Sequence, residues 1–115
     1  DLPTEFSPVL SERELVDEQP RLAQFAGRDI LLVKRGGRIS AMRASCSHLG
    51  GPLADGTLEG DAIRCPWHGS LFSLADGSVL EGPASVAQPV FETRVRDGQI
   101  EVRYAFPSRS VANSR

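Results

Sequence analysis

All of the cysteines and histidines of this chain lie in two short motifs, Cys46-Ser47-His48 and Cys65-Pro66-Trp67-His68, with sixteen residues between them. Thiolate sulfur and neutral imidazole are ligands of iron, zinc and copper. Four such ligands in two matched arms predict a single metal site. The two cysteines could instead form a disulfide, but a histidine two or three residues from each cysteine favours the metal.

The order of these ligands does not fit the common structural zinc sites. Those sites present Cys-x-x-Cys arms, or two cysteines followed by two histidines on a helix. Here each arm offers one cysteine and one histidine, spaced Cys-x-His and Cys-x-x-His. The spacing indicates another kind of metal centre, although a mononuclear zinc or iron site remains an alternative.

The segments on either side of the motifs have the patterns of short strands. Residues 29–34 and 38–42 flank Gly36-Gly37, and glycines tolerate the positive φ of a tight turn, so we expect a hairpin that leads to the first motif. Residues 61–64 lead into the second motif, and residues 71–74 return from it. Both motifs are therefore expected at the tips of hairpins.

A third hairpin is predicted near the C-terminal end. Residues 90–95 and 99–104 alternate apolar and polar side chains around Asp97-Gly98, a pattern typical of half-buried strands joined by a tight turn. Ser11-Glu12-Arg13-Glu14 has the form of a capping box, but Pro20 follows soon, so at most a short turn or helix fits there. Together the patterns predict a β-rich domain.

The composition fits one soluble, turn-rich domain. The chain has 115 residues, of which 40% are hydrophobic and 24% charged, with 11 glycines and 8 prolines. No run approaches the roughly 18 apolar residues of a membrane span. The net charge is −2 and Lys34 is the only lysine, so no polybasic run indicates nucleic-acid binding.

The residues around both motifs resemble those of the Rieske family of 2Fe-2S proteins. Cys46-Ser47-His48-Leu49-Gly50-Gly51-Pro52-Leu53 is similar to the first loop of that family, and Cys65-Pro66-Trp67-His68-Gly69-Ser70 to the second. The resemblance extends over roughly residues 27–104 and includes the turn Glu81-Gly82-Pro83-Ala84. It implies an all-β fold, a Rieske-type antiparallel β sandwich with a small cluster-binding subdomain.

The resemblance also implies a division of the chain. We expect the Rieske domain at residues 27–106, with a first cluster-binding loop at residues 45–53 and a second loop at residues 64–72. Residues 1–26 are expected to pack on this domain or to lead into it. Residues 107–115 are polar and are expected to form a tail or linker.

By resemblance, the chain binds one 2Fe-2S cluster. Cys46 and Cys65 would bind the inner iron, and His48 and His68 the outer one. The residues expected to shield this cluster are Leu49, Gly50, Pro66 and Trp67.

Two further residues are expected to tune the potential of the cluster. Ser70 stands where many members aim a hydroxyl at a bridging sulfide, although an ordinary turn serine is the alternative. Phe72 stands where high-potential members carry a tyrosine that donates a hydrogen bond to a cysteine sulfur. Those members also carry a disulfide where this chain has Gly51 and Trp67. The departures imply a ferredoxin-like protein in the lower half of the roughly −150 to +300 mV Rieske range.

The function implied is that of a one-electron carrier between a reductase, such as a flavoprotein, and an oxygenase or other acceptor. No catalytic residue is expected, since Rieske oxygenases react at a separate iron held by two histidines and a carboxylate, and both histidines here are assigned to the cluster. One alternative is a Rieske module from a larger oxygenase, reductase or membrane-anchored protein. A less favoured alternative is a structural metal-binding module for protein interactions.

The start of the chain adds one expectation about its origin. It begins at Asp1 rather than at a methionine, so we expect a processed chain or a piece of a longer protein. No export signal is present in the sequence, and a cytoplasmic location is the default expectation.

Overall fold

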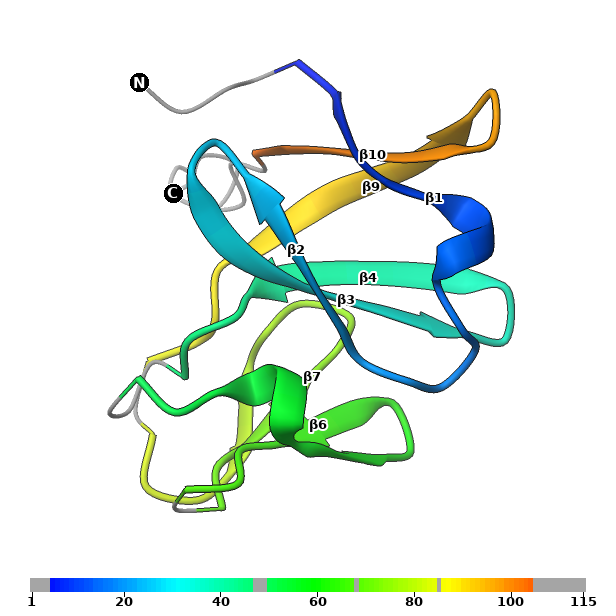
Figure 1. Ribbon diagram of the computed structural model, residues 1–115. Coiled ribbons are helices and arrows are strands. Elements are labelled where there is room, and N and C mark those ends of the chain that lie inside the picture. The colour runs from blue at the N-terminus through cyan, green and yellow to red at the C-terminus, as the bar shows by residue number, and fades with distance from the viewer. Residues whose placement is uncertain (1–4, 47–49, 68, 85, 105–115) are drawn as a thin grey trace, which may run out of the picture.

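The computed structural model describes residues 5–46, 50–67, 69–84 and 86–104, which form two antiparallel sheets (Figure 1). The strands of the large sheet are, in spatial order, β1 (Ser7–Ser11), β10 (Gln99–Tyr104), β9 (Val90–Arg96), β4 (Arg38–Arg43), β3 (Arg28–Arg35) and β2 (Arg21–Phe25). Those of the small sheet are β5 (Thr57–Glu59), β6 (Ala62–Arg64), β7 (Leu71–Ser73) and β8 (Val79–Glu81). This architecture confirms the expected all-β antiparallel fold.

Strand β3, which lies between β4 and the edge strand β2, is buried on both of its faces. Successive side chains of a strand point to opposite sides of the sheet, so Ile30 and Leu32 join one apolar cluster while Leu31 and Val33 join another. This arrangement explains why residues 30–33 are apolar without alternation. The first cluster packs the strands of the large sheet against one another. The second joins the large sheet to the small one, and its members from the small-sheet half include Leu53, Ile63 and Phe72.

The three predicted strand pairs are present in the structure. Strands β3 and β4 are joined at Gly36-Gly37, where φ is 56° and 82°, and β9 and β10 are joined at Asp97-Gly98, where φ is 52° and 77°. Strands β6 and β7 flank the second loop. The predicted capping box is a 3-10 helix of three residues, Glu12–Glu14, and the Ser11 side chain makes no capping hydrogen bond. That segment is therefore the short turn that the sequence predicts.

The expectation that both motifs lie at hairpin tips is correct only for the second. Strand β4 pairs with β3 and β9 in the large sheet, whereas β5 pairs with β6 in the small sheet. The first loop therefore carries the chain from one sheet to the other. An isolated antiparallel bridge between Ser45 and Pro52 closes this loop in place of a strand pair.

The N-terminal residues supply both edges of the large sheet. Strand β1 pairs with β10 at one edge, and β2 pairs with β3 at the other. A 3-10 helix, Leu53–Asp55, follows the first loop. Among the described residues, no helix has the length and apolar character needed to cross a membrane.

The buried side chain of Gln88 fastens the segment after β8 to the start of the first loop. Gln88 is only 2% exposed, and its Nε2 donates hydrogen bonds of 2.9 Å to the carbonyl oxygens of both Arg43 and Ser45. Its backbone N–H donates to the carbonyl of Gly77 at 2.8 Å. Gln88 therefore connects three segments that are distant in sequence, one contact through its side chain and the other through its backbone.

The first prediction concerns this bridge. Gln88→Leu removes both side-chain hydrogen bonds while keeping a side chain of similar size, and it leaves two partly buried carbonyl groups without that donor. We expect the free energy of unfolding to fall by about 1–3 kcal/mol, measured by urea titration. Gln99→Leu, at an exposed position of β10, is the control and should change stability by less than about 0.5 kcal/mol. Equal stability of both variants would show that the bridge contributes nothing.

Candidate metal centre

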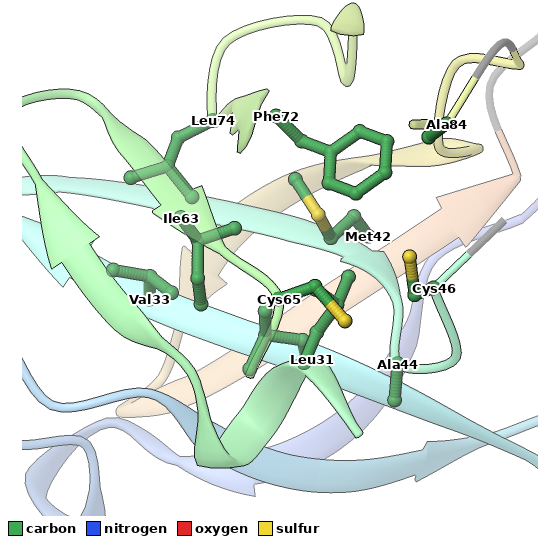
Figure 2. Close-up of a cluster of buried hydrophobic side chains, with 11 residues drawn as sticks. Leu31, Val33, Met42, Ala44, Cys46, Ile63, Cys65, Phe72, Leu74 and Ala84 are labelled. Carbon is green, nitrogen blue, oxygen red and sulfur yellow. The ribbon is translucent and has the colours of Figure 1, made fainter. Parts of the chain in front are cut away.

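The two cysteines lie close together in the core although they come from different halves of the fold. Cys46 follows β4 of the large sheet, and Cys65 follows β6 of the small one. The side chains are 4% and 3% exposed and belong to the apolar cluster that joins the sheets (Figure 2). Neither cysteine is part of a disulfide. The fold thus brings both thiols into one buried cluster.

Gly51 is the point at which the first loop approaches the second. A Cβ added at Gly51 would lie 2.6 Å from Sγ of Cys65 and 3.3 Å from Cβ of Trp67, so any side chain there requires a shift of the loops. The carbonyl of Gly51 also accepts a hydrogen bond of 2.8 Å from the N–H of Cys46. Glycine at this position therefore lets the backbone of the first loop lie directly against the Cys65 sulfur.

Backbone hydrogen bonds close the second loop. The N–H of Cys65 donates to the carbonyl of Ser70 at 2.8 Å, and the N–H of Gly69 donates to the carbonyl of Cys65 at 3.1 Å. Gly69 adopts a φ of 81°, which glycine takes without strain. Cys65 therefore stands at the base of a tight turn.

A third segment, residues 81–84, covers the second loop. The buried hydroxyl of Ser70 accepts a hydrogen bond of 3.1 Å from the N–H of Ala84. A Cβ added at Gly82, whose φ is 99°, would lie 2.5 Å from Cα of Ser70. The sequence indicates this segment only through its resemblance to the Rieske family and predicts no contact between it and the second loop. The Gly-Pro pair at 82–83 is the feature of the sequence that marks the turn.

Phe72 lies in the apolar cluster that also contains both cysteines. Its ring is fully buried, and Figure 2 shows it beside Met42, turned to the side on which Ala84 and Cys46 lie. The surroundings of this ring are apolar. Both cysteines therefore pack in the same apolar cluster as this ring.

The remaining predicted site residues are partly described. Trp67 is 57% exposed, and Pro66 and Gly50 are exposed as well. His48, Leu49 and His68 lie outside the described residues. The structure thus brings together Cys46, Cys65, Ser70 and Phe72 and places Trp67 at the surface beside Gly51.

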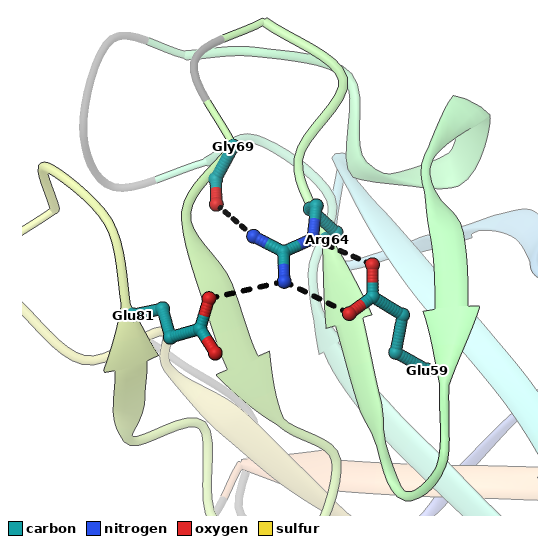
Figure 3. A network of polar contacts seen from close by, with 4 residues as sticks. All are labelled: Glu59, Arg64, Gly69 and Glu81. Carbon is teal, nitrogen blue, oxygen red and sulfur yellow. Dashed lines mark hydrogen bonds and ion pairs between the residues drawn. The ribbon is translucent and has the colours of Figure 1, made fainter.

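Arg64 carries a polar network at the base of the second loop (Figure 3), which sequence analysis did not single out as part of the site. Its guanidinium forms ion pairs with Glu59 on β5 and Glu81 on β8, at 2.6 and 3.1 Å. The hydrogen bond from Arg64 holds the pKa of Glu59 below its ordinary value, and the two carboxylates raise the pKa of Arg64. The separation of five residues between Glu59 and Arg64 is a weak signal of this network in the sequence, because the hairpin of β5 and β6 that brings them together was not predicted.

The candidate metal ligands that the structure describes, Cys46 and Cys65, fit an iron–sulfur centre. Thiolates prefer zinc, copper(I) and iron–sulfur clusters, and two of them are placed here on two loops. Among the described residues, no group of three histidine, cysteine, aspartate or glutamate side chains could hold a metal ion. Further protein ligands of such a site would therefore come from residues outside the described ranges. In the sequence, a histidine lies two or three positions after each cysteine.

Comparisons with known proteins identify the family of the chain. Residues 5–92 match the model of the Rieske [2Fe-2S] domain. The chain is 32% identical to "Ferredoxin CarAc" of Metapseudomonas resinovorans over 90 residues, which cover 75% of this chain and 84% of that protein. It is 31% identical to human "Apoptosis-inducing factor 3" over 95 residues, which cover 83% of this chain but only 16% of that protein.

A solved structure has the same fold. It is described as "Complex of reduced oxygenase and oxidized ferredoxin in carbazole 1,9a-dioxygenase", and the matching chain has a TM-score of 0.81 and 27% identity. The match covers 88% of this chain and 96% of that one. Two buried thiols on facing loops and these matches lead to one conclusion: the chain belongs to the Rieske [2Fe-2S] domain family, whose members bind a 2Fe-2S cluster.

Proposed function

We propose that this protein is a one-electron carrier that passes electrons from a reductase to an oxygenase or other acceptor. The observation that carries the proposal is the match to ferredoxin CarAc, which extends over 84% of that protein. The chain therefore corresponds to nearly all of a protein named as a ferredoxin. The likeness to a chain in an oxygenase–ferredoxin complex supports an oxygenase as the acceptor.

The ligands of the cluster in this proposal are Cys46 and Cys65 on one iron and His48 and His68 on the other. Burial of both thiols between the sheets supports the role of the cysteines, and the position of each histidine two or three residues further along supports that of the imidazoles. When bound, the cluster supplies the one-electron redox chemistry. The protein holds the two cysteines apart from water, and the histidine side is where the electron leaves.

A second candidate is a Rieske module that works inside a larger protein. The chain covers only 16% of human apoptosis-inducing factor 3. It also matches 31% of a chain described as "Terminal oxygenase of carbazole 1,9a-dioxygenase from Novosphingobium sp. KA1", a likeness in fold alone. Electron transfer through the cluster is the task in both candidates, which differ in whether the partners are separate proteins.

The test begins with protein purified without oxygen. We expect about two irons and two acid-labile sulfides per chain, and after dithionite reduction an anisotropic EPR signal with an average g near roughly 1.9. Replacement of His48 or His68 by Cys should lower the potential or lose the cluster. A flavoprotein ferredoxin reductase with NADH should reduce the wild type, and a Rieske oxygenase with its substrate should reoxidise it. A sulfide-free, EPR-silent protein with one zinc would instead indicate a structural metal module.

Ser70→Ala tests the tuning of the cluster. If the hydroxyl proton donates to a sulfide, the hydrogen bond is stronger in the more negative reduced state. Loss of this hydrogen bond destabilises the reduced state relative to the oxidised state by about 1–2 kcal/mol. This lowers the midpoint potential by roughly 40–90 mV for one electron. Ser73→Ala is a matched control, because the Ser73 hydroxyl accepts a backbone hydrogen bond from Ala75 at 3.1 Å near the other end of β7. An unchanged midpoint in Ser70→Ala would remove the tuning role.

Phe72→Tyr should move the midpoint in the opposite direction. The new hydroxyl would add a donor on the side of the cysteines, and a donor to sulfur favours the reduced state. We expect an upward shift on the order of tens of millivolts, measured by redox titration. Phe91→Tyr, in the large sheet, is the control. Identical midpoints in Phe72→Tyr and the wild type would mean that the far edge of the ring is not directed at a sulfur.

A further inference from the structure

We propose that Arg64 is a positioning residue for the cluster: its guanidinium closes the second loop and offsets one of the two negative charges of the carboxylates that it binds. The consequence is a higher reduction potential and slower loss of the cluster. This inference deepens the proposed function, because it rests on ligation of the cluster by Cys65 and His68. It concerns a residue that touches the loop and not the cluster itself.

The contacts of Arg64 reach three separate segments. Its Nη1 donates to the carbonyl oxygen of Gly69 at 2.7 Å, and its Nε and Nη2 donate to the two carboxylate oxygens of Glu59 at 2.6 and 2.8 Å. Nη2 also donates to Glu81 at 3.1 Å. Figure 3 shows the guanidinium between these partners, with β5 on one side and β8 on the other. The planar fork of arginine allows all of these bonds at once.

These bonds fasten the two ends of the second loop. Arg64 is the last residue of β6 and precedes Cys65 directly, while Gly69 follows His68 directly. The bond from Arg64 to the carbonyl of Gly69 therefore spans the stretch of chain that carries both ligands. This bond adds to the two backbone bonds at Cys65. The Arg64 side chain is itself held by carboxylates on β5 and β8, the two edge strands of the small sheet. A shift of Gly69 would move the backbone that leads to His68.

The charge of Arg64 matters because its neighbourhood in the sequence is acidic. Residues 46–89 contain five acidic residues and a single basic one, Arg64, whereas the whole chain has a net charge of −2. This stretch therefore carries −4 and the remainder +2 with histidines counted as neutral. Reduction adds a negative charge to the cluster, so uncompensated carboxylates near it oppose reduction. Arg64 offsets one of the two negative charges of Glu59 and Glu81.

A pair on the large sheet provides a matched control. Arg103 on β10 forms an ion pair with Glu92 on β9 at 2.5 Å, and its side chain is 42% exposed, compared with 30% for Arg64. Both arginines thus bond a carboxylate across neighbouring strands. Arg103 also stacks on the ring of Phe6, near the N-terminus.

The experiment compares Arg64→Met, Arg64→Lys and Arg103→Met in the cluster-loaded protein. The readouts are the midpoint potential, the EPR g values and the rate of iron release to a ferrous chelator, with far-UV circular dichroism to verify folding. Arg64→Met should have a lower midpoint than the wild type and should release iron roughly three- to tenfold faster. Arg64→Lys keeps the charge without the fork, so its midpoint should stay near that of the wild type while iron release accelerates. Arg103→Met should match the wild type in all readouts.

A further variant separates charge from loop closure. Glu81→Gln removes one carboxylate but leaves the bond between Arg64 and Gly69, so its midpoint should rise while iron release stays unchanged. If Arg64→Met fails to assemble a cluster, Glu81→Gln still tests the charge effect. A midpoint of Glu81→Gln that falls or stays unchanged would overturn that effect.

The outcomes distinguish this inference from the proposed function. If the wild type holds the cluster and Arg64→Met behaves like Arg103→Met, Arg64 is an ordinary surface ion-pair residue and only this inference fails. If the wild type itself lacks the 2Fe-2S signal, the proposed ligation fails and this inference fails with it.

Discussion

The close approach of two loops from different sheets is the constraint on which the rest of the structure depends. Cys46 follows a strand of the large sheet and Cys65 a strand of the small one, and Gly51 lies against the Cys65 sulfur without room for a side chain. Such a contact requires the two sheets to be fixed relative to each other. The apolar cluster that contains Met42, Phe72 and both cysteines provides that fixation.

Polar contacts then restrict what apolar packing alone would leave loose. Dispersion and burial are non-directional, so they hold the sheets together without setting the conformation of the loops. Gln88 fastens the start of the first loop, Ser70 fastens the covering segment 81–84, and Arg64 fastens the base of the second loop. Each side chain bonds at least one backbone group, and those of Gln88 and Ser70 do so in a segment distant in sequence. The cluster-binding half of the molecule is therefore positioned by directed bonds on an apolar base.

The sequence predicted the parts of the fold that depend on local patterns. Gly36-Gly37 and Asp97-Gly98 mark turns whose positive φ is confirmed, and the alternation in residues 90–95 and 99–104 marks their strands. The prediction was wrong for the first loop, whose flanks pair in different sheets. Nothing local distinguishes a hairpin tip from a crossover between sheets, because both need a loop between two short strands.

The sequence by itself determined the family and the cofactor class, because both follow from the residue types and spacing of the two cysteine–histidine motifs and their resemblance to the family. Only the tertiary structure decided that Gly51 contacts the Cys65 sulfur, that Gln88 bridges Arg43 and Ser45, and that Arg64 joins Glu81 to Gly69. These contacts link residues whose separation in sequence ranges from 5 to 45. They exist because two sheets fold onto one apolar cluster, and that packing has no local signature in the chain.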